Sequence, residues 1–530
     1  MDTQEHIETR SRLGNLEQEM RGRSAIEFFR HARATYFGTN KEDETLDNIL
    51  RTVSMQLKTT PEQLWSSEVF QLLFRATKPE HLKILGLEQY EEEAKRTVTA
   101  GRRMSILPYN AVMGDTTIQK YVPSRPDKFS GNWRHSIDPY GIFRELDRVI
   151  AINNAGKKTY LATRKFPYAV LANITESCFI GCDGCYKGSM VRTSLAALAE
   201  VDLEYAQIKM ELSLQQERAE RQAELLTRWL NKNSEVDTIV MSGGEPTLFS
   251  NQALEKILDQ YKQADTVKVV RMCTSSIFQG MWYRIDDEFV HLLQNFERET
   301  GKQFYINAHV TDDFQLSAPE ARMAVERLKR GGISVHLQMP LQEGINFRRD
   351  DIAWSVAKLR KISKIAYSLG VIPYKMIVDM HSPSHPDLTV PIETVTKVIG
   401  FLDQHENHSD HERWQAYNVL HEQGNLYLTT YPHFTAVKDI DENTQRVTYF
   451  IPKVEFGERK RIIVHTYEEP IIQGHNDNPN SFGNIQDTEI NNKIDQVREA
   501  HKKLQNDPKK IKEFYKESGI IYPENKPLRV

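Results

Sequence analysis

The chain has 530 residues and a mass of 61.4 kDa, enough for two or three domains or for one large barrel with appendages. Its formal net charge of -4, with 39% hydrophobic and 27% charged residues, provides no basic excess for binding nucleic acid. No apolar run approaches bilayer length and the opening residues mix both signs of charge, so we expect no membrane span and a cytoplasmic location.

The first part of the chain, residues 1–110, is predicted to be a helical N-terminal region. In TTPEQLWSSEVFQLLFRA, Thr60, Pro61 and Gln63 supply a cap, a first-turn proline and an N3 partner, and apolar residues follow at helical spacing. Residues 111–165 are rich in Pro, Gly and aromatic residues, so we expect an irregular linker there.

From residue 166 to residue 411, short β-rich runs alternate with longer helical runs, which is typical of parallel strands joined by helices. Strands are expected at 168–175, 236–242, 266–273, 303–310, 333–340 and 371–379, and helices at 194–232, 251–263, 286–299, 316–330, 351–369 and 391–404. Ser317 and Glu320 are interpreted as a capping box, and Gly331 as the end of that helix. The fold class is therefore α/β, a partial (βα)6 barrel whose chemistry gathers after the carboxyl ends of the strands.

The C-terminal part is predicted to add a β-containing cap to this barrel. Residues 412–475 hold three β-rich segments, NLYLTTYPHFTAV, RVTYFIPKVEF and KRIIVHTYEEP, which we interpret as an antiparallel accessory layer. Residues 476–530 are expected to form a charged helix near 486–505 and a loosely held tail.

Three of the four cysteines lie within eight residues, in the segment ESCFIGCDGC directly after the first predicted barrel strand. Cys178, Cys182 and Cys185 have the spacing Cys-x3-Cys-x2-Cys, and thiols in a reducing compartment are more often metal-binding or catalytic than disulfide-bonded. Four-iron clusters and structural zinc normally take four protein ligands, so three thiolates leave one metal position open. A zinc site completed by a remote histidine and thiols without function are the alternatives, and Cys273 is interpreted as a core residue.

The segment MSGGEPTL follows the second predicted strand and forms a second candidate site. We expect the two glycines to let the backbone approach a ligand closely, and the glutamate to offer its carboxylate to an ammonium group. The candidate ligand-binding residues of this segment are Ser242, Gly243, Gly244, Glu245 and Pro246.

Polar residues also stand near the ends of the next three predicted strands: Arg271, Asn307, His309 and Gln338. Together they predict a ligand pocket at the mouth of the barrel, with Arg271 as the residue for a ligand carboxylate.

The spacing of the three cysteines resembles that of the radical S-adenosylmethionine superfamily, and MSGGEPTL resembles its Gly-Gly-Glu-Pro segment. The resemblance implies that Cys178, Cys182 and Cys185 hold a [4Fe-4S] cluster whose open iron chelates S-adenosylmethionine. The residues that it implies for binding this cofactor are Ser242, Gly243, Gly244, Glu245, Pro246, Arg271, Asn307, His309 and Gln338. It implies that an electron from the cluster splits this cofactor to a 5'-deoxyadenosyl radical, which abstracts hydrogen from a small, amino-acid-like substrate. A flavodoxin or ferredoxin is implied as the electron donor.

Within that superfamily, residues 165–470 most resemble the lysine 2,3-aminomutase group, through KFPYAVLANITESC, INAHVTDD, LQMPLQEGIN and VIPYKMIVDM. Enzymes of that group bind pyridoxal phosphate through a lysine in a glycine-rich segment and an arginine in an aromatic-Pro-x-Arg site. Here TYPHFTAVKDID contains Lys438 but no glycine run, and the second site reads Phe166, Pro167, Tyr168 and Ala169. We therefore expect that pyridoxal phosphate is not used.

Three readings of the function remain at this point. The first is a radical enzyme without pyridoxal phosphate, the second is a pyridoxal-phosphate-dependent 2,3-aminomutase using Lys438, and the third is a non-catalytic zinc or iron-sulfur protein. The candidate substrate-binding residues are Tyr374, Asp379 and Lys438.

Overall fold

The molecule is built around a large, mostly parallel sheet. The computed structural model describes residues 46–83, 85–99, 104–113, 148–166, 168–178, 180, 182, 185, 205–378, 388–403, 413–421, 424–427, 437–443, 445–455, 461–471, 488–504 and 526–530. Within them the main sheet has the strand order β10-β9-β8-β7-β6-β5-β4-β3-β2-β1-β14.

Seven neighbouring strands of the described sheet run parallel. They are β3 (Ala169–Thr175), β4 (Thr238–Gly243), β5 (Val269–Thr274), β6 (Gln303–His309), β7 (Ser334–Leu341), β8 (Ile372–Val378) and β9 (Ala416–His421). The first six confirm the predicted strands and the partial barrel. The seventh, β9, was missed because the segment AYNVLH has only two strongly apolar branched residues.

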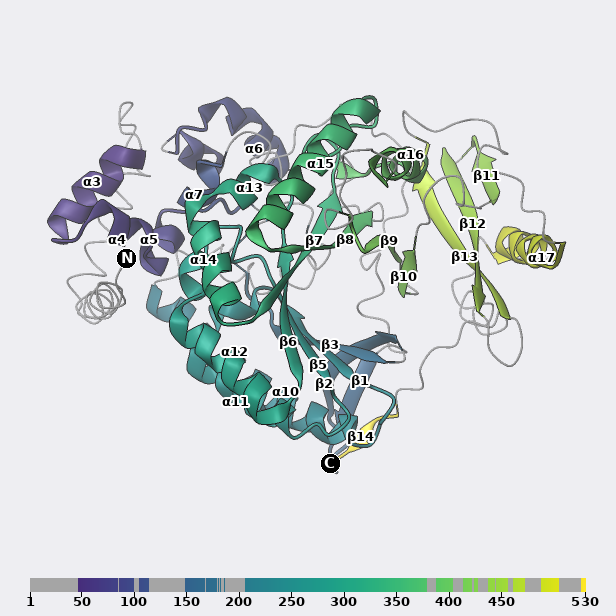
Figure 1. Ribbon diagram of the computed structural model, residues 1–530, viewed down its shortest axis with the longest axis horizontal. Helices are drawn as coiled ribbons and strands as arrows, with labels where there is room; N and C mark the ends of the chain where they lie inside the picture. The colour runs from purple at the N-terminus through teal and green to yellow at the C-terminus, as the bar shows by residue number, and fades with distance from the viewer. Residues whose placement is uncertain are drawn as a thin grey trace.

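Helices connect these parallel strands in chain order. They are α10 (Tyr205–Leu230), α11 (Asn251–Lys262), α12 (Asp287–Thr300), α13 (Asp313–Ser317) with α14 (Pro319–Arg330), α15 (Ile352–Leu369) and α16 (Ile392–Asp403). Figure 1 shows α10, α11, α12 and α14 side by side along one face of the sheet. We call this the outer face and the opposite one the inner face.

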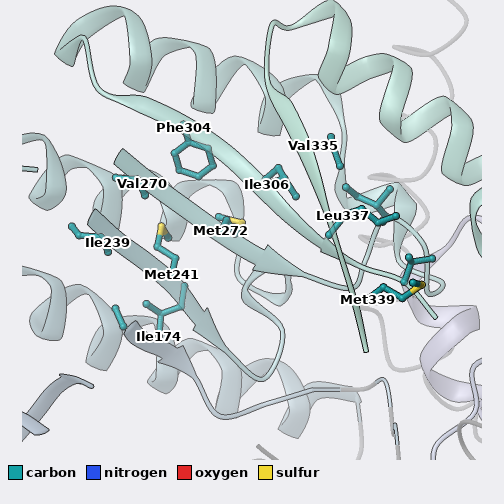
Figure 2. Packing of buried hydrophobic residues seen from close by; sticks show 14 of the residues in the cluster. Ile174, Ile239, Met241, Val270, Met272, Phe304, Ile306, Val335, Leu337 and Met339 are labelled. Atoms are coloured by element: carbon teal, nitrogen blue, oxygen red, sulfur yellow. The ribbon is translucent and has the colours of Figure 1, made fainter. Parts of the chain in front are cut away.

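Side chains on the outer face alternate with those on the inner face, as they must in a pleated strand. Figure 2 shows the outer-face residues packed between the sheet and the helices. They belong to one hydrophobic core and include Ile239, Met241, Val270, Met272, Phe304, Ile306, Val335 and Leu337.

One predicted helix start is wrong. Ser317 is the last residue of α13, where its hydroxyl donates to the Asp313 carbonyl oxygen (2.9 Å). The next helix starts at Pro319, because the residue before a proline, Ala318, is pushed into the extended conformation and cannot continue α13. Ala318 has no side-chain oxygen, so this helix has no side-chain cap. The helix ends at Arg330 as expected, although the positive φ of +76° belongs to Gly332 and not to Gly331.

The expected linker 111–165 contains two strands, which corrects the prediction of irregular structure there. β1 (Arg148–Ile152) and β2 (Lys158–Phe166) form an antiparallel hairpin that joins the sheet beside β3. The Asn153 side-chain oxygen accepts from two backbone amides of the turn, and Gly156 has a φ of +75°. An Asn-Asn-Ala-Gly turn between alternating residues was the available signal.

The chain end is not loosely held throughout, which corrects a second prediction. β14 (Leu528–Arg529) pairs in parallel with β1, and the Trp229 indole donates to the Lys526 carbonyl oxygen (3.0 Å). The helix predicted near 486–505 is confirmed as α17 (Thr488–Leu504). The lysine-rich residues 505–525 lie outside the described residues.

The N-terminal region is helical, as predicted, over the part that is described. It contains α3 (Leu46–Gln56), α4 (Pro61–Trp65), α5 (Glu68–Leu73), η1 (Pro79–Leu82), η2 (Glu88–Tyr90), α6 (Glu91–Thr99) and α7 (Pro108–Ala111). The capping box of Thr60 and Gln63 is confirmed. The Tyr109 ring lies 4.4 Å from that of Trp282 between centroids, which attaches this region to the barrel.

The C-terminal cap consists of a separate antiparallel sheet of β11 (Val437–Asp441), β12 (Arg446–Glu455) and β13 (Arg461–Pro470). Helix α17 packs on it through Ile494 and Val497, which contact Phe450 and Val464. The short strand β10 (Gly424–Tyr427), expected in this layer, instead pairs with β9 in the main sheet. None of the described helices is long and apolar enough to span a membrane.

Candidate active site

The loop that carries the cysteines starts at the carboxyl end of β3. Gln215 of α10 holds its first residues: its amide oxygen accepts from the Thr175 hydroxyl (2.9 Å) and the Glu176 amide (3.1 Å), and its nitrogen donates to the Ser177 hydroxyl (2.9 Å). Gln215 is almost fully buried. Sequence reasoning missed it, because a glutamine within a long charged helix carries no signal of this role.

The Gly-Gly turn after β4 clasps this loop through the backbone. The Gly244 amide donates to the Thr175 carbonyl oxygen (2.7 Å), and the Glu245 amide donates to that of Ser177 (2.9 Å). Gly243 has a φ of +134°, and a Cβ at either glycine would lie about 2 Å from a carbonyl oxygen of the cysteine loop, at 2.1 Å for Gly243 and 2.0 Å for Gly244. The two glycines therefore let the backbone approach the cysteine loop, and their expected approach to a ligand stays a prediction.

The Glu245 carboxylate is buried and ties the β4 loop to the β5 loop. It accepts from the Thr274 hydroxyl (2.6 Å), the Ser275 amide (2.8 Å) and the Thr247 hydroxyl (2.9 Å). Burial raises the pKa of this carboxyl group, and the hydrogen bonds from Thr274, Ser275 and Thr247 oppose the rise. The expected role of the carboxylate, to receive a ligand ammonium group, stays a prediction.

The three clustered cysteines are half-buried. Cys178 and Cys182 pack against the core of the N-terminal region, which includes Leu107 and Ile180. Burial raises the pKa of the Cys178 thiol, and the nearby Glu245, Cys182 and Cys185 raise it further.

As placed, the described residues contain no group of three His, Cys, Asp or Glu side chains ready to hold a metal ion. The Cys178 thiol instead lies 3.4 Å from the Ile180 carbonyl oxygen. The chemistry of the donor set still fits an iron-sulfur cluster, because three thiols on one loop are the soft ligands that such clusters take.

Gln279 bridges the cysteine loop and β6, and sequence reasoning missed it too. Its amide oxygen lies 3.7 Å from the Cys182 sulfur, and its amide nitrogen lies 2.7 Å from Nδ1 of His309. Gln279 is fully buried, and its backbone carbonyl oxygen accepts a hydrogen bond from the Asn110 side-chain amide (3.3 Å). The N-terminal region, the cysteine loop and the predicted site residue His309 therefore meet at Gln279.

The sheet register shows how the other predicted residues are ordered on the inner face. Arg271 of β5 pairs with Val240 of β4. Two residues further toward the carboxyl end of β5, Cys273 pairs with Asn307 of β6. His309 pairs with Gln338 one level further on. Ser242, which ends the inner row of β4, lies two residues beyond Val240.

Four inner-face side chains from four neighbouring strands contact one another in a closed ring. Arg271 Nη1 donates to the Tyr374 hydroxyl (3.3 Å), and its guanidinium carbon lies 5.7 Å from the centre of the Tyr305 ring. Tyr305 stacks on His336 at 4.3 Å, and the His336 ring meets Tyr374 edge-on at 5.5 Å. We call Arg271, Tyr305, His336 and Tyr374 the inner-face quartet. It brings together two predicted residues, Arg271 and Tyr374, and two that the sequence did not indicate.

Lys438 does not stand where a cofactor could reach it. Its ammonium group is buried in the C-terminal cap and lies 2.6 Å from a Glu393 carboxylate oxygen. The Tyr449 hydroxyl lies within hydrogen-bond distance of both Glu393 (3.3 Å) and Glu469 (2.9 Å) in the same network. A lysine held in a buried ion pair is a poor amine nucleophile, so the described residues do not fit a pyridoxal phosphate site at Lys438. Asp379 and Pro167 lie outside the described residues.

No family model matches the chain. It is 25% identical over 243 residues to a protein of Aquifex aeolicus that is provisionally named an L-lysine 2,3-aminomutase, a match that covers 46% of this chain and 57% of that protein. It is 24% identical over 404 residues to the glutamate 2,3-aminomutase of Clostridioides difficile, covering 73% of this chain and 82% of the relative. The L-lysine 2,3-aminomutase of Bacillus subtilis is 22% identical over 320 residues, covering 60% of this chain and 59% of the relative.

The first of these matches spans little more than half of the relative's own length, 57%. The names nevertheless agree with one another and with the motifs around Cys178 and Gly243. The chain is therefore similar to proteins of the lysine 2,3-aminomutase group.

Proposed function

We propose that this protein is a radical S-adenosylmethionine enzyme that cleaves its cofactor reductively and abstracts hydrogen from a small, amino-acid-like substrate. The observation that carries the proposal is the backbone clasp between the Gly-Gly turn and the cysteine loop, made by the amides of Gly244 and Glu245. It joins two segments at the carboxyl ends of neighbouring parallel strands, where ligands bind in such sheets. The similarity to aminomutases supports the same reading.

In this proposal Cys178, Cys182 and Cys185 hold the cluster. The bound cluster would supply the electron that splits S-adenosylmethionine into a 5'-deoxyadenosyl radical. The backbone of residues 242–246 borders the cofactor, with His309 and Gln338 beside it on the inner face. A flavodoxin or ferredoxin would deliver the electron.

The N-terminal region would keep water from this chemistry. Its apolar core reaches the cysteine loop at Cys178 and Cys182, and Asn110 bonds to the backbone of Gln279. A radical that meets water or a stray hydrogen donor is lost, so covering the site is a task for the protein.

The enzyme would work without pyridoxal phosphate at Lys438. The Lys438 ammonium group is already paired with Glu393, and no arginine stands at the site of Phe166, Tyr168 and Ala169. The rival reading, a pyridoxal-phosphate-dependent aminomutase, requires this pair to open. A borohydride-fixed adduct at Lys438 in protein incubated with pyridoxal phosphate would establish the rival.

The test is the formation of 5'-deoxyadenosine by reconstituted protein, reduced with dithionite under anaerobic conditions and given S-adenosylmethionine. We expect product from the wild type and none from Cys182→Ala. Cys273→Ala is the matched control, because Cys273 lies on β5 and outside the Cys-x3-Cys-x2-Cys segment, and we expect this variant to retain its iron. Zinc at one atom per chain, with no iron after reconstitution, would support the non-catalytic alternative.

A further inference from the structure

The inner-face quartet contains one permanent positive charge and no negative one. Arg271 forms no ion pair with any described residue, whereas two other partly buried arginines do, Arg349 with Glu343 and Arg498 with Asp439. Burial and the nearby Arg271 lower the pKa of His336 to about 4, so this imidazole is neutral at neutral pH. A partly buried guanidinium without a counter-ion is costly, and an anion beside it would remove that cost.

Hydrogen-bond donors of the quartet also lack acceptors. Arg271 Nε is buried and has no partner among the described residues. The Tyr374 hydroxyl accepts from Arg271, and no described residue accepts its own proton. Donors grouped around a fixed charge are what a carboxylate requires, because a carboxylate accepts several hydrogen bonds and donates none.

An acceptor stands next to these donors. Asn307 follows Tyr305 by two residues on β6, so both side chains project from the same face of the sheet. Asn307 is only 5% exposed, and its Oδ1 has no partner among the described residues. A buried amide oxygen without a donor needs one, and the ammonium group of an amino acid is such a donor.

We propose that the inner-face quartet is the subsite for the carboxylate of the substrate, with the Asn307 oxygen available to the substrate's ammonium group. This proposal rests on the proposed function and deepens it, because it names the residues that would hold the two charged groups of an amino-acid-like substrate. The carboxylate is the substrate's and not that of S-adenosylmethionine. Arg271 stands level with Val240, three residues before Gly243, which corresponds to about 10 Å along the strand from the Gly-Gly turn.

The subsite is tested with acetate, the carboxylate group alone, on protein without cluster, cofactor or reductant. Saturation-transfer NMR would measure the dissociation constant for acetate, with acetamide as the neutral molecule of the same shape. We expect acetate but not acetamide to bind, and Arg271→Gln to weaken acetate binding at least tenfold. Arg348→Gln is the matched control, because Arg348 also packs on an aromatic ring, Trp354 at 4.2 Å, but is exposed, and we expect less than a twofold change.

Equal binding of acetate by wild type and Arg271→Gln would overturn the proposal. If Arg271→Gln does not fold, as judged by circular dichroism, Tyr374→Phe decides, because it removes one hydroxyl and keeps the ring. A loss of affinity of twofold or more supports the subsite, and unchanged affinity overturns it.

Two further arms separate the sources of the carboxylate and the two proposals. Unchanged binding of S-adenosylmethionine by reconstituted Arg271→Gln supports the assignment to the substrate, and a tenfold loss overturns it. Acetate binding at Arg271 without any 5'-deoxyadenosine formation would support the anion subsite while the proposed function fails. Formation of 5'-deoxyadenosine without acetate binding would overturn the subsite proposal and leave the proposed function standing.

Discussion

The two faces of the parallel sheet differ more than the faces of such sheets usually do. Parallel strands are commonly apolar on both sides, because helices cover both. Here the outer face carries residues such as Phe304, Ile306 and Leu337, whereas the inner face of the same strands carries Tyr305, Asn307 and His336. The outer face is therefore sufficient to explain the fold, and the inner face has polar groups that the fold does not require.

The faces also treat charge differently. On the outer side, the Asp313 carboxylate of α13 forms ion pairs with Lys358 and Lys361 of α15. Lys358 also forms an ion pair with Asp312. On the inner face Arg271 has a tyrosine hydroxyl and an aromatic ring as its contacts, and no described carboxylate. Paired charges stabilise, whereas an uncompensated charge within a protein is a mark of a binding site.

The largest effect is expected at the edge where the faces meet, in the cysteine loop. Cys178→Ala should abolish the formation of 5'-deoxyadenosine and reduce iron content at least tenfold, because the remaining thiols cannot hold the cluster alone. Iron analysis after anaerobic reconstitution measures this, with Cys273→Ala as the control. Normal iron content in Cys178→Ala would show that the cluster is held elsewhere.

Two adjacent residues on β6 test whether the outer and inner faces contribute differently to stability, because Phe304 lies on the outer face and Tyr305 on the inner face. Phe304 is 2% exposed and meets Phe296 edge-on at 5.9 Å, so Phe304→Ala should lower the free energy of unfolding by about 3–5 kcal/mol. Tyr305→Phe removes only a hydroxyl that bonds to no described residue, and should cost less than about 0.5 kcal/mol. Urea unfolding measures both. Equal losses would mean that the inner face contributes to folding as the outer face does.

Glu245→Gln should lower the free energy of unfolding by about 1–3 kcal/mol, because the amide replaces an acceptor oxygen with donors that face Thr274 and Ser275. Iron retention should fall with it, since Glu245 joins the loops beside the cysteines. The exposed Glu255→Gln on α11 is the control and should behave as the wild type does. Unchanged thermal unfolding of Glu245→Gln would argue against this buried network.

The smallest effect is expected in the outer charge cluster. Burial by itself would raise the pKa of Asp313, but hydrogen bonds from Lys358 and Lys361 outweigh it and lower the pKa from 3.8 to about 2. The stabilisation is therefore complete above about pH 4 and is lost as the pH falls toward 2. Asp313→Asn should cost about 1–2 kcal/mol at pH 7, after allowance for the exposed Lys361.

The gap between wild type and Asp313→Asn should narrow as the pH falls below 4, which urea unfolding at a series of pH values would detect. Asp287→Asn is the control, because Asp287 is half exposed in its pair with Arg327, and should cost less than about 0.5 kcal/mol. A gap that does not change with pH would contradict the assigned pKa.

Much of the barrel could be predicted, because period-2 and period-3.6 patterns alternate clearly between residues 168 and 378. β9, β1, β2 and β14 escaped because each depends on pairing with a neighbour that local sequence does not reveal. The split of the helix before Pro319 was available in the sequence, but the preference of Ser317 for caps concealed it.

The local motifs of the candidate site could be predicted from the sequence, but the contacts between its distant residues could not. The Cys-x3-Cys-x2-Cys and Gly-Gly-Glu-Pro segments are local, so they could be found, whereas the actual contacts of Gly243 and Glu245 could not. Gln215, Gln279 and His336 act through neighbours that are distant in the chain, and a single glutamine or histidine has no pattern. The roles of the predicted site residues as ligands stay predictions.

The central claim is that three cysteines hold a cluster with one iron free for S-adenosylmethionine. The most direct measurement is the electron paramagnetic resonance spectrum of the reduced, reconstituted protein before and after addition of this cofactor. We predict a cluster signal that shifts on addition in the wild type and in Cys273→Ala. A cluster signal that the cofactor leaves unchanged, with every iron already held by protein side chains, would contradict the account.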